Sequence, residues 1–544
     1  MPNPNNPFHP IIYVRGYAMT PTEIDATTAD PFCGFNLGST VFRSVPDRTQ
    51  QPRKYIFQSP VVRLASDFKY ENVYQDGYDI LDPEWETDAT GKPTDNKLAN
   101  RSIIIFRYYD EASRMLGVGE TPPIDVFARK LGELILRVQK LVCQNEKNGV
   151  TEDAFRCYLV AHSMGGLVCR ALLQNPKNDP QHAHRFVDKL FTYATPHNGI
   201  EMAGMNVPSW LTVDDMSNFN RNRMADYLGL NDLPNKPPGG RVDWLPEKRF
   251  SSEKVFCMVG TNRLDYEVAL GLSRTFAGHG SDGLVKIENA TLCGLKDNGQ
   301  PGQQCAKAFA YRSHSGYFGI VNSEEAYQNL TRFLFGNVRV DVWVDVTDIR
   351  LPAAVQEEQN AGRTVNALYQ FELLASPRGK LWYLTRRTSE EDSVACLNHT
   401  EWLAAPKEKG NLYISTVFLA NRAKVNPNST TLAYSLTLGV RSPDYEIDRK
   451  LWINEHYEGG YLFRNAVVLN MTPPDIPGEK WKITYSWQGT AVNLVAEEIA
   501  AKTIKGGKVV VNVPLPSDGI TRPGIEGQLR FVVSAWNPDA AMDT

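Results

Sequence analysis

The stretch that most constrains the fold of this chain is 155–173, FRCYLVAHSMGGLVCRALL. Its apolar run ends at His162, and the apolar residues after Ser163 recur at helical spacing, so the stretch predicts a strand, a sharp turn and a helix. A serine at such a turn is lifted above the edge of a sheet, and Gly165 and Gly166 leave room for the two backbone arms to pass. The motif AHSMG is the variant of GxSxG in which alanine replaces the first glycine.

The composition is that of a soluble globular protein rather than a disordered or fibrous one. Of the 544 residues, 42% are hydrophobic and 22% are charged. This length exceeds one ordinary core, and we expect two large domains. The formal net charge is −4, with lysines and arginines dispersed along the chain, so the sequence predicts no nucleic-acid partner.

The N-terminal segment 1–16 has no basic start, apolar h-region or small-residue cleavage site, so no signal peptide is expected. No run approaches the roughly 20 apolar residues of a membrane-spanning helix. The expected location is the cytoplasm, with export without a leader as the alternative.

The eight cysteines do not follow a disulfide-rich pattern, and we expect free thiols. Cys293 and Cys305, on either side of a Gly/Gln-rich loop, form the one suggestive pair. No Cys/His spacing resembles a zinc site, and we expect neither a metal nor a cofactor.

Residues 1–336 alternate between strand and helix patterns, which favours a mostly parallel sheet with helices on both faces. Strands are predicted at 11–14, 102–106, 157–160, 190–194 and 255–260. Asp125 is expected to cap a helix whose apolar residues recur at spacings of three and four. In such sheets, functional sites lie at the carboxyl ends of the strands.

Two stretches interrupt this pattern, near 64–100 and 200–250. Both are too long for plain connections, and we expect lid or cap insertions over the site or, alternatively, surface insertions.

From residue 337 to 544 the pattern changes to alternating strands separated by Pro, Gly and Asn turns, which predicts an all-β sandwich. The expected strands are 338–346, 412–420, 432–440, 461–469, 481–487, 508–513 and 529–536. Seven of the ten tryptophans lie in this part. We expect them in a core or interface, with a lipid- or glycan-binding surface as the alternative.

Activation of a serine hydroxyl needs a base that a carboxylate orients. After a strand–serine–helix turn, the required order along the chain is serine, acid, histidine. Ser163, Asp282 and His314 satisfy it. Asp282 lies in a glycine-flanked turn, and His314 lies in a Ser/Gly loop before a helix that begins near Ser323.

Other residues compete for these roles. His197 ends a strand near the serine but precedes Asp282 in the chain, and His162, next to the serine, is expected to be structural. His279 is too close to Asp282 along the chain to bridge to the serine. Asp265 is the rival acid.

An acyl-transfer site also needs N–H groups that stabilise the charge developing on the substrate oxygen. The expected donors are the backbone N–H groups of Met164, directly after the serine, and of Tyr17, in the loop after the first strand.

These motifs together resemble the α/β-hydrolase fold and, within it, the lipase-like families that include bacterial lipases and GPI inositol-deacylase-like proteins. The resemblance covers about residues 8–336. It rests on RGYA at 15–18, AHSMGG at 161–166, TPHNG at 195–199, SDGLV at 281–285 and SHSG at 313–316. It implies a carboxylic-ester hydrolase whose triad is Ser163, Asp282 and His314, with Tyr17 donating to the oxyanion.

Two residues near this site are candidates for substrate contact. The lipase-like families usually have histidine before the loop glycine, where this chain has Arg15. We expect Arg15 either to form a structural ion pair or to contact a phosphate or carboxylate on the substrate. His197 is the second candidate.

The sequence therefore predicts an α/β-hydrolase catalytic domain over 1–336 followed by a β-sandwich over 337–544. The expected activity is that of a serine esterase, lipase or phospholipase acting through an acyl-enzyme on a small-molecule or lipid ester, with transient contact to a lipid surface. An amidase or acyltransferase shares the same triad. A non-catalytic interaction protein on a hydrolase scaffold is the alternative outside enzymes. The oligomeric state is left open.

Overall fold

The structure is a computed structural model of the whole chain. It describes residues 8–16, 21–29, 32, 34–35, 38–43, 53–73, 97–114, 117, 122–202, 205–206, 218–264, 280–316, 318–423, 428, 431–448, 455–472, 482–488, 497–499, 502–504, 507–516 and 522–537. The chain divides into two compact units. The first comprises 1–307 with 311–330, and the second comprises 308–310 with 331–544.

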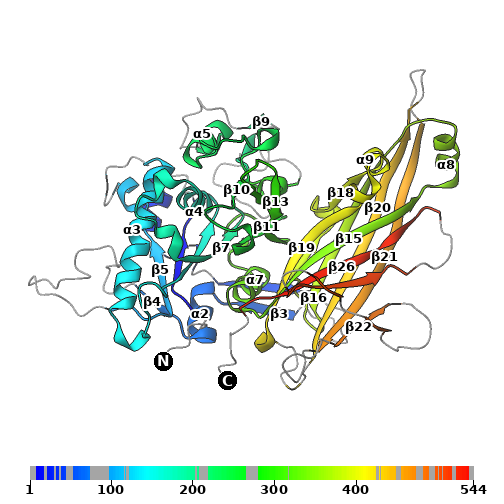
Figure 1. Cartoon of the computed structure of the whole chain (residues 1–544). Helices are drawn as coiled ribbons and strands as arrows, with labels where there is room; N and C mark the ends of the chain where they lie inside the picture. Colours follow the sequence, from blue (N-terminus) through cyan, green and yellow to red (C-terminus); the bar gives the residue numbers. More distant parts are fainter. Residues whose placement is uncertain are drawn as a thin grey trace, which may run out of the picture. The chain divides into compact units, whose positions relative to one another are not determined.

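The first unit is organised around a seven-stranded sheet, of which only residues 308–310 of one edge strand are assigned to the second unit (Figure 1). Its spatial order is β14 (Ala306–Ala310), β11 (Val255–Gly260), β7 (Val187–Tyr193), β6 (Cys157–His162), β1 (Ile11–Val14), β5 (Ser102–Phe106) and β4 (Glu71–Asn72). From β11 to β4 every neighbouring pair is parallel. In register, Val14 pairs with Ala161 and with Phe106, and His162 pairs with Tyr193. The carboxyl ends of four strands therefore meet at one edge.

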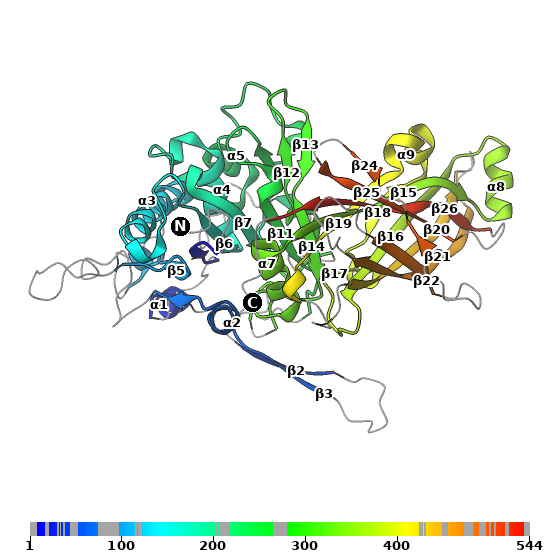
Figure 2. The same cartoon turned by 60° about the horizontal axis from the view of Figure 1, so that its bottom comes forward.

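Helices pack on this sheet because alternate strand residues point to opposite faces. Ile12 and Val14 join the core cluster that α3 (Ile124–Cys143) and α4 (Met164–Gln174) cover, whereas the Tyr13 ring contacts Phe35, 4.5 Å away between centroids. Helices α2 (Pro60–Phe68) and α7 (Glu324–Phe335) are neighbours (Figure 2). Arg63 of α2 pairs with Glu324 of α7. The predicted mostly parallel α/β sheet is confirmed.

The N-terminus of α3 differs from the prediction. The capping position is Pro123, which makes no side-chain hydrogen bond, and Asp125 lies in the first helical turn. There Asp125 accepts a hydrogen bond from Arg129 at 2.9 Å. Asp125 therefore stabilises the helix through an i,i+4 pair and its position near the positive end of the helix dipole, not as a cap.

The described parts of the two predicted insertions belong to the body of the first unit. Residues 64–73 include most of α2 and the edge strand β4, whereas 74–96 lie outside the described residues. Within 218–250 lie α5 (Arg221–Tyr227) and β10 (Trp244–Pro246), whose Met224 and Leu245 are in the core cluster. Residues 207–217 lie outside the described part.

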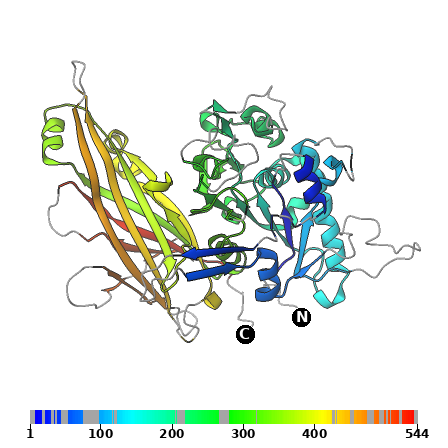
Figure 3. The same cartoon turned by 180° about the vertical axis from the view of Figure 1, so that it is seen from behind.

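The second unit contains two antiparallel sheets, whose long strands run from yellow to red in Figure 3. The first has the order β19 (Asn411–Leu419), β15 (Val338–Arg350), β26 (Gly524–Ala535), β25 (Val509–Pro514) and β24 (Lys502–Thr503). The second has the order β17 (Thr385–Arg387), β16 (Val365–Pro377), β20 (Leu432–Ile447), β21 (Glu455–Thr472), β22 (Lys482–Trp487) and β23 (Glu497–Glu498), and β18 (Ala395–Asn398) also pairs with β16.

One apolar core receives alternate residues from both sheets, as in a β-sandwich. In β16 buried and less buried residues alternate along the strand, yet this strand was not among those predicted. Trp402 and Trp487 are buried, and no described tryptophan of this unit is fully exposed. The predicted β-rich C-terminal domain is confirmed. Trp382 packs against its core, whereas Trp343 and Trp536 are partly buried outside the core cluster.

Seven cysteines lie in the described part of the chain, and all of them, including Cys293 and Cys305, are free thiols. Among the helices that the structure describes, none is long and apolar enough to cross a bilayer.

A completely buried arginine, Arg170 of α4, ties three segments of the first unit together. Its guanidinium donates to the carbonyl oxygens of His197, Val242 and Trp244 at 2.9–3.0 Å. Its Nε lies 3.2 Å from Gln174 Oε1. Burial lowers the pKa of Arg170 to about 10, so the side chain remains charged near neutral pH.

Replacing Arg170 by methionine keeps much of the side-chain volume but leaves these buried carbonyl oxygens without their donor. We expect Arg170→Met to lower the free energy of unfolding by about 3–5 kcal/mol, measured by urea denaturation. The exposed Arg129→Met in α3 is the control and should cost less than about 1 kcal/mol. Equal effects of the two variants would contradict the anchoring role.

His399 of the second unit is buried as a neutral ring. Tyr369 donates to its Nδ1 at 2.8 Å, and its Nε2 donates to Gln359 Oε1 at 2.9 Å. Desolvation lowers the pKa of His399 from 6.5 to about 4. Between these two pH values the unfolded chain binds a proton here that the folded protein does not bind.

The contribution of His399 to stability is therefore present above pH 6.5 and declines as the pH falls toward 4. We expect the decline to reach about 1.4 kcal/mol per pH unit for this group. Glutamine does not titrate, so in His399→Gln the number of protons taken up on unfolding between pH 6.5 and 4 should fall by up to one. The urea midpoint of this variant should therefore depend less steeply on pH. An unchanged slope in this variant would show that His399 does not contribute.

Candidate active site

Ser163 lies at the turn between β6 and α4, at the carboxyl edge of the sheet. Its backbone has φ 51° and ψ −125°, a strained conformation for a residue with a side chain. The Ser163 N–H donates to the Tyr193 carbonyl at 2.9 Å, which fixes the turn to the neighbouring strand β7. The predicted strand, sharp turn and helix are therefore present in this order.

The turn requires glycine at two positions because other segments approach it closely. A Cβ atom at Gly165 would lie 2.2 Å from the Arg15 carbonyl oxygen and 2.4 Å from that of Val14. A Cβ atom at Gly166 would lie 2.2 Å from Thr195 Oγ1. The start of α4 thus packs directly against the backbone that follows β1.

His314 and Asp282 extend a hydrogen-bond chain from Ser163. His314 Nε2 lies 2.9 Å from Ser163 Oγ, and His314 Nδ1 lies 2.9 Å from Asp282 Oδ2. Because a carboxylate can only accept, Nδ1 carries the proton and Nε2 accepts from the serine hydroxyl. The three residues are at most 3% exposed. The structure brings the three predicted triad residues together.

Backbone groups fix the orientation of Asp282. Its Oδ1 accepts from the N–H groups of Leu284 and Val285 at 3.0 and 2.8 Å, which leaves Oδ2 for His314. The Asp282 carbonyl also accepts from the His314 N–H at 3.0 Å. The acid and the base are therefore held to each other by both backbone and side chain.

His162 holds the base through the backbone carbonyl of His314. Its Nε2 donates to the His314 carbonyl at 2.8 Å, and the two rings lie 5.0 Å apart between centroids. Desolvation by the surrounding protein, together with the His314 ring, lowers the pKa of His162 to about 3, although the ring keeps some exposure. His162 is thus neutral and acts as a hydrogen-bond donor, in agreement with its expected structural role.

Asn198, in TPHNG, holds the segment that follows the acid, a role that the sequence analysis missed. Its N–H and Nδ2 donate to the Asn289 carbonyl and to Asn289 Oδ1 at 3.1 and 2.9 Å. Its Oδ1 accepts from the Val242 N–H at 2.9 Å. The sequence signal for this role was the position of Asn198, a polar residue that follows Thr195 and Pro196 shortly after a predicted strand.

His197 lies in the core and not beside the triad. It is completely buried, its Nε2 lies 3.2 Å from Thr192 Oγ1, and its carbonyl accepts from Arg170. Burial holds the pKa of His197 well below its usual range. In place of the expected substrate contact, the structure gives His197 a position in the anchored core.

The loop after β1 lies beside the serine turn. The Tyr108 hydroxyl lies 2.7 Å from the Arg15 carbonyl and 3.1 Å from the Gly16 carbonyl, and it donates its hydrogen to this pair. Tyr17, an expected oxyanion donor, lies outside the described residues. Met164, the other expected donor, is the first residue of α4, where helical N–H groups have no intrahelical acceptor. Its N–H is therefore available beside Ser163.

The rival acid and one rival base fall in a part of the chain that is not described. Asp265 and His279 both lie between 265 and 279. Among the described residues, Asp282 is the carboxylate that contacts the His314 ring.

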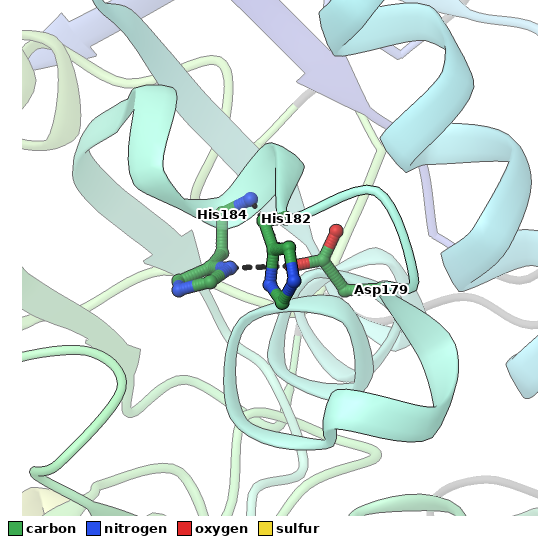
Figure 4. A group of neighbouring side chains, drawn as sticks. All are labelled: Asp179, His182 and His184. Atoms are coloured by element: carbon green, nitrogen blue, oxygen red, sulfur yellow. Dashed lines mark hydrogen bonds and ion pairs between the residues drawn. The ribbon is translucent and has the colours of Figure 1, made fainter.

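A separate group of Asp179, His182 and His184 has ligand atoms close enough for a metal ion (Figure 4). It lies before β7, at the opposite end of the strand from the triad. Asp179 already accepts from Arg249 at 2.8 Å, from the Ala183 N–H at 2.7 Å and from the His184 ring. Since Arg249 brings a positive charge to the carboxylate, we interpret the group as an anchor for the loop before β7.

The close approach at Gly165 gives a direct test of the turn. We expect Gly165→Ala to lower the free energy of unfolding by at least about 2 kcal/mol, because the new methyl group overlaps two carbonyl oxygens. Gly132→Ala in α3 is the matched control, since its nearest atom would be a flexible Leu172 methyl group at 3.2 Å. A Gly165→Ala protein with wild-type stability would contradict the close packing described here.

Comparison with known proteins gives one match to a family model. Residues 128–222 match the PGAP1-like alpha/beta domain, a segment that includes most of α3, the serine turn and TPHNG. No curated protein sequence is significantly similar to the chain.

The solved structures that match the chain have low sequence identity and low TM-scores. Bacillus licheniformis lipase BlEst2 in mature form has a TM-score of 0.23 and 13% identity, and covers 53% of this chain and 81% of its own. The product of gene lin2722 from Listeria innocua has a TM-score of 0.25 and 11% identity, over 60% and 93%. Phospholipase PlaB from Legionella pneumophila in complex with thio-NAD has a TM-score of 0.26 and 13% identity, over 82% and 89%.

These TM-scores are too low to support an argument about activity, so the assignment rests on the family match and on the topology. The sheet is parallel from β11 to β4, and a serine turn joins β6 to α4 at its carboxyl edge. The first unit therefore has the topology of an α/β-hydrolase fold, and residues 128–222 are similar to the PGAP1-like alpha/beta domain.

Proposed function

We propose that this protein is a serine hydrolase that cleaves carboxylic esters of lipids through an acyl-enzyme. The observation that carries the proposal is the hydrogen-bond chain from Ser163 Oγ through the His314 ring to Asp282. It lies on a strained turn at the edge of the sheet where such folds bind ligands. Lipid esters are the proposed substrates because the motifs around the triad resemble those of lipase-like hydrolases, and the family match includes the serine turn.

The geometry defines the role of each group. Ser163 Oγ attacks the ester carbonyl carbon while its proton moves to His314 Nε2, and Asp282 stabilises the resulting imidazolium. The Met164 N–H, at the positive end of α4, stabilises the oxyanion of the tetrahedral intermediate. His314 then returns the proton to the departing alcohol, which leaves an acyl group on Ser163.

Hydrolysis of the acyl-enzyme repeats these steps with water. His314 accepts a proton from the water as it attacks the acyl carbon, and then gives that proton back to Ser163 Oγ as the acid product leaves. Neither half of the reaction needs a residue beyond those in the hydrogen-bond chain and the oxyanion donors.

A fluorophosphonate probe tests whether Ser163 is activated. We expect labelling of the wild type at Ser163, together with hydrolysis of p-nitrophenyl esters and of phospholipids, and neither in Ser163→Ala. A folded protein that does not react with the probe would favour the non-catalytic interpretation. Full activity of Ser163→Ala would reject Ser163 as the nucleophile.

The role of Asp282 has its own kinetic signature. We expect Asp282→Asn to lower kcat by roughly a thousandfold or more, because an amide no longer stabilises the imidazolium. Asp125→Asn, which removes a surface carboxylate on α3, is the matched control and should leave kcat within about twofold. A similarly small effect of Asp282→Asn would assign the acid to another residue.

A further inference from the structure

Arg15 carries a positive charge beside the serine turn that no carboxylate neutralises within the described part of the chain. It follows the last residue of β1, and its carbonyl is held by the Tyr108 hydroxyl at 2.7 Å. The same carbonyl approaches Gly165 at the start of α4. The backbone of Arg15 is therefore fixed against the element that carries Ser163.

Two of the three guanidinium nitrogens of Arg15 lack hydrogen-bond partners. Its Nε and Nη1 atoms are buried and make no hydrogen bond in the structure, while the residue as a whole keeps partial exposure. Other partly buried arginines of this unit pair with carboxylates: Arg63 with Glu324, Arg221 with Glu201, Arg249 with Asp179 and Arg312 with Glu325. Arg15 departs from that pattern.

The surroundings of Arg15 contain other polar groups, but the described ones supply no negative charge. Burial raises the pKa of Tyr108 and lowers that of His162, and the charge of Arg15 opposes the first shift and adds to the second. Both side chains are neutral near pH 7. A desolvated guanidinium without an anion destabilises the folded protein. A bound anionic ligand would remove this cost by pairing with the charge.

Resting on the proposed ester hydrolysis, we propose that Arg15 forms an anion subsite for a phosphate group on the alcohol part of the substrate. A planar guanidinium presents parallel N–H groups that match two phosphate oxygens. The backbone of Arg15 packs against the start of α4, directly after Ser163, so we assign the bound phosphate to the molecule whose ester is cleaved. The enzyme thereby prefers anionic phosphate-bearing esters over neutral ones.

The test compares two soluble short-chain esters that differ in the phosphate, dihexanoylphosphatidic acid and dihexanoylglycerol. We expect Arg15→Met to lower the ratio of their kcat/KM values by about 10- to 100-fold, the effect of losing a charge-assisted hydrogen-bonded pair. Arg15→Lys should keep part of the preference, because lysine keeps the positive charge but lacks the two parallel N–H groups of the guanidinium. Arg129→Met, which changes an exposed side chain of α3, should keep the wild-type ratio.

A second readout does not depend on activity. Inorganic phosphate should raise the thermal midpoint of the wild type and not that of Arg15→Met, because a ligand stabilises only the protein that binds it. Without phosphate, we expect Arg15→Met to unfold at the wild-type temperature or above it, whereas Arg170→Met unfolds earlier. Equal stabilisation of both proteins by phosphate would place the anion elsewhere and overturn the proposal.

The kinetic outcomes separate this proposal from the proposed function. If the wild type cleaves dihexanoylglycerol in a Ser163-dependent manner and Arg15→Met leaves the ratio unchanged, the subsite is wrong and the hydrolase stands. A loss of both activities by the same factor would likewise overturn the subsite, since Arg15 would then only support the loop. If Arg15→Met fails to fold, Arg15→Lys and Arg15→Gln give the same comparison.

Discussion

The contact between the start of α4 and the backbone after β1 is the constraint on which the site depends. The carbonyl oxygens of Val14 and Arg15 occupy the space that a side chain at Gly165 would need. This approach holds Ser163 in a conformation with φ 51°, whose cost the surrounding packing must offset. The same contact brings Gly16, after β1, close to the serine, since a Cβ atom at Gly16 would lie 3.0 Å from Ser163 Cβ.

Around this contact, backbone atoms rather than side-chain ion pairs hold the other two members of the triad. His162 donates to the His314 carbonyl, and Asn198 binds the segment that follows Asp282 through two hydrogen bonds. These partners come from β6 and from the end of β7, which are adjacent strands. The positions of the acid and the base therefore depend on contacts between loops at the carboxyl edge of the sheet.

The parts of the fold that the sequence predicted are those encoded by local patterns. The β6–turn–α4 segment could be read from apolar spacing and two glycines, and the order of Ser163, Asp282 and His314 followed from the topology that this segment implies. Contacts between distant segments, such as Asn198 with Asn289, leave no periodic signal in one sequence. Asp125 shows that local patterns do not fix the exact start of a helix, because a carboxylate at the capping position and one in the first turn give similar sequence patterns.

Arg15 and Arg170 show how the same side chain serves two purposes within one unit. Arg170 meets acceptors from three segments, so its charge is solvated by the protein and its place is structural. Arg15 meets none at Nε and Nη1, although both atoms are buried beside the serine turn. Because folding gains nothing from a desolvated and unpaired guanidinium, the contribution of Arg15 must arise when an anion arrives. That step couples the charge of the substrate to the position of its ester beside Ser163.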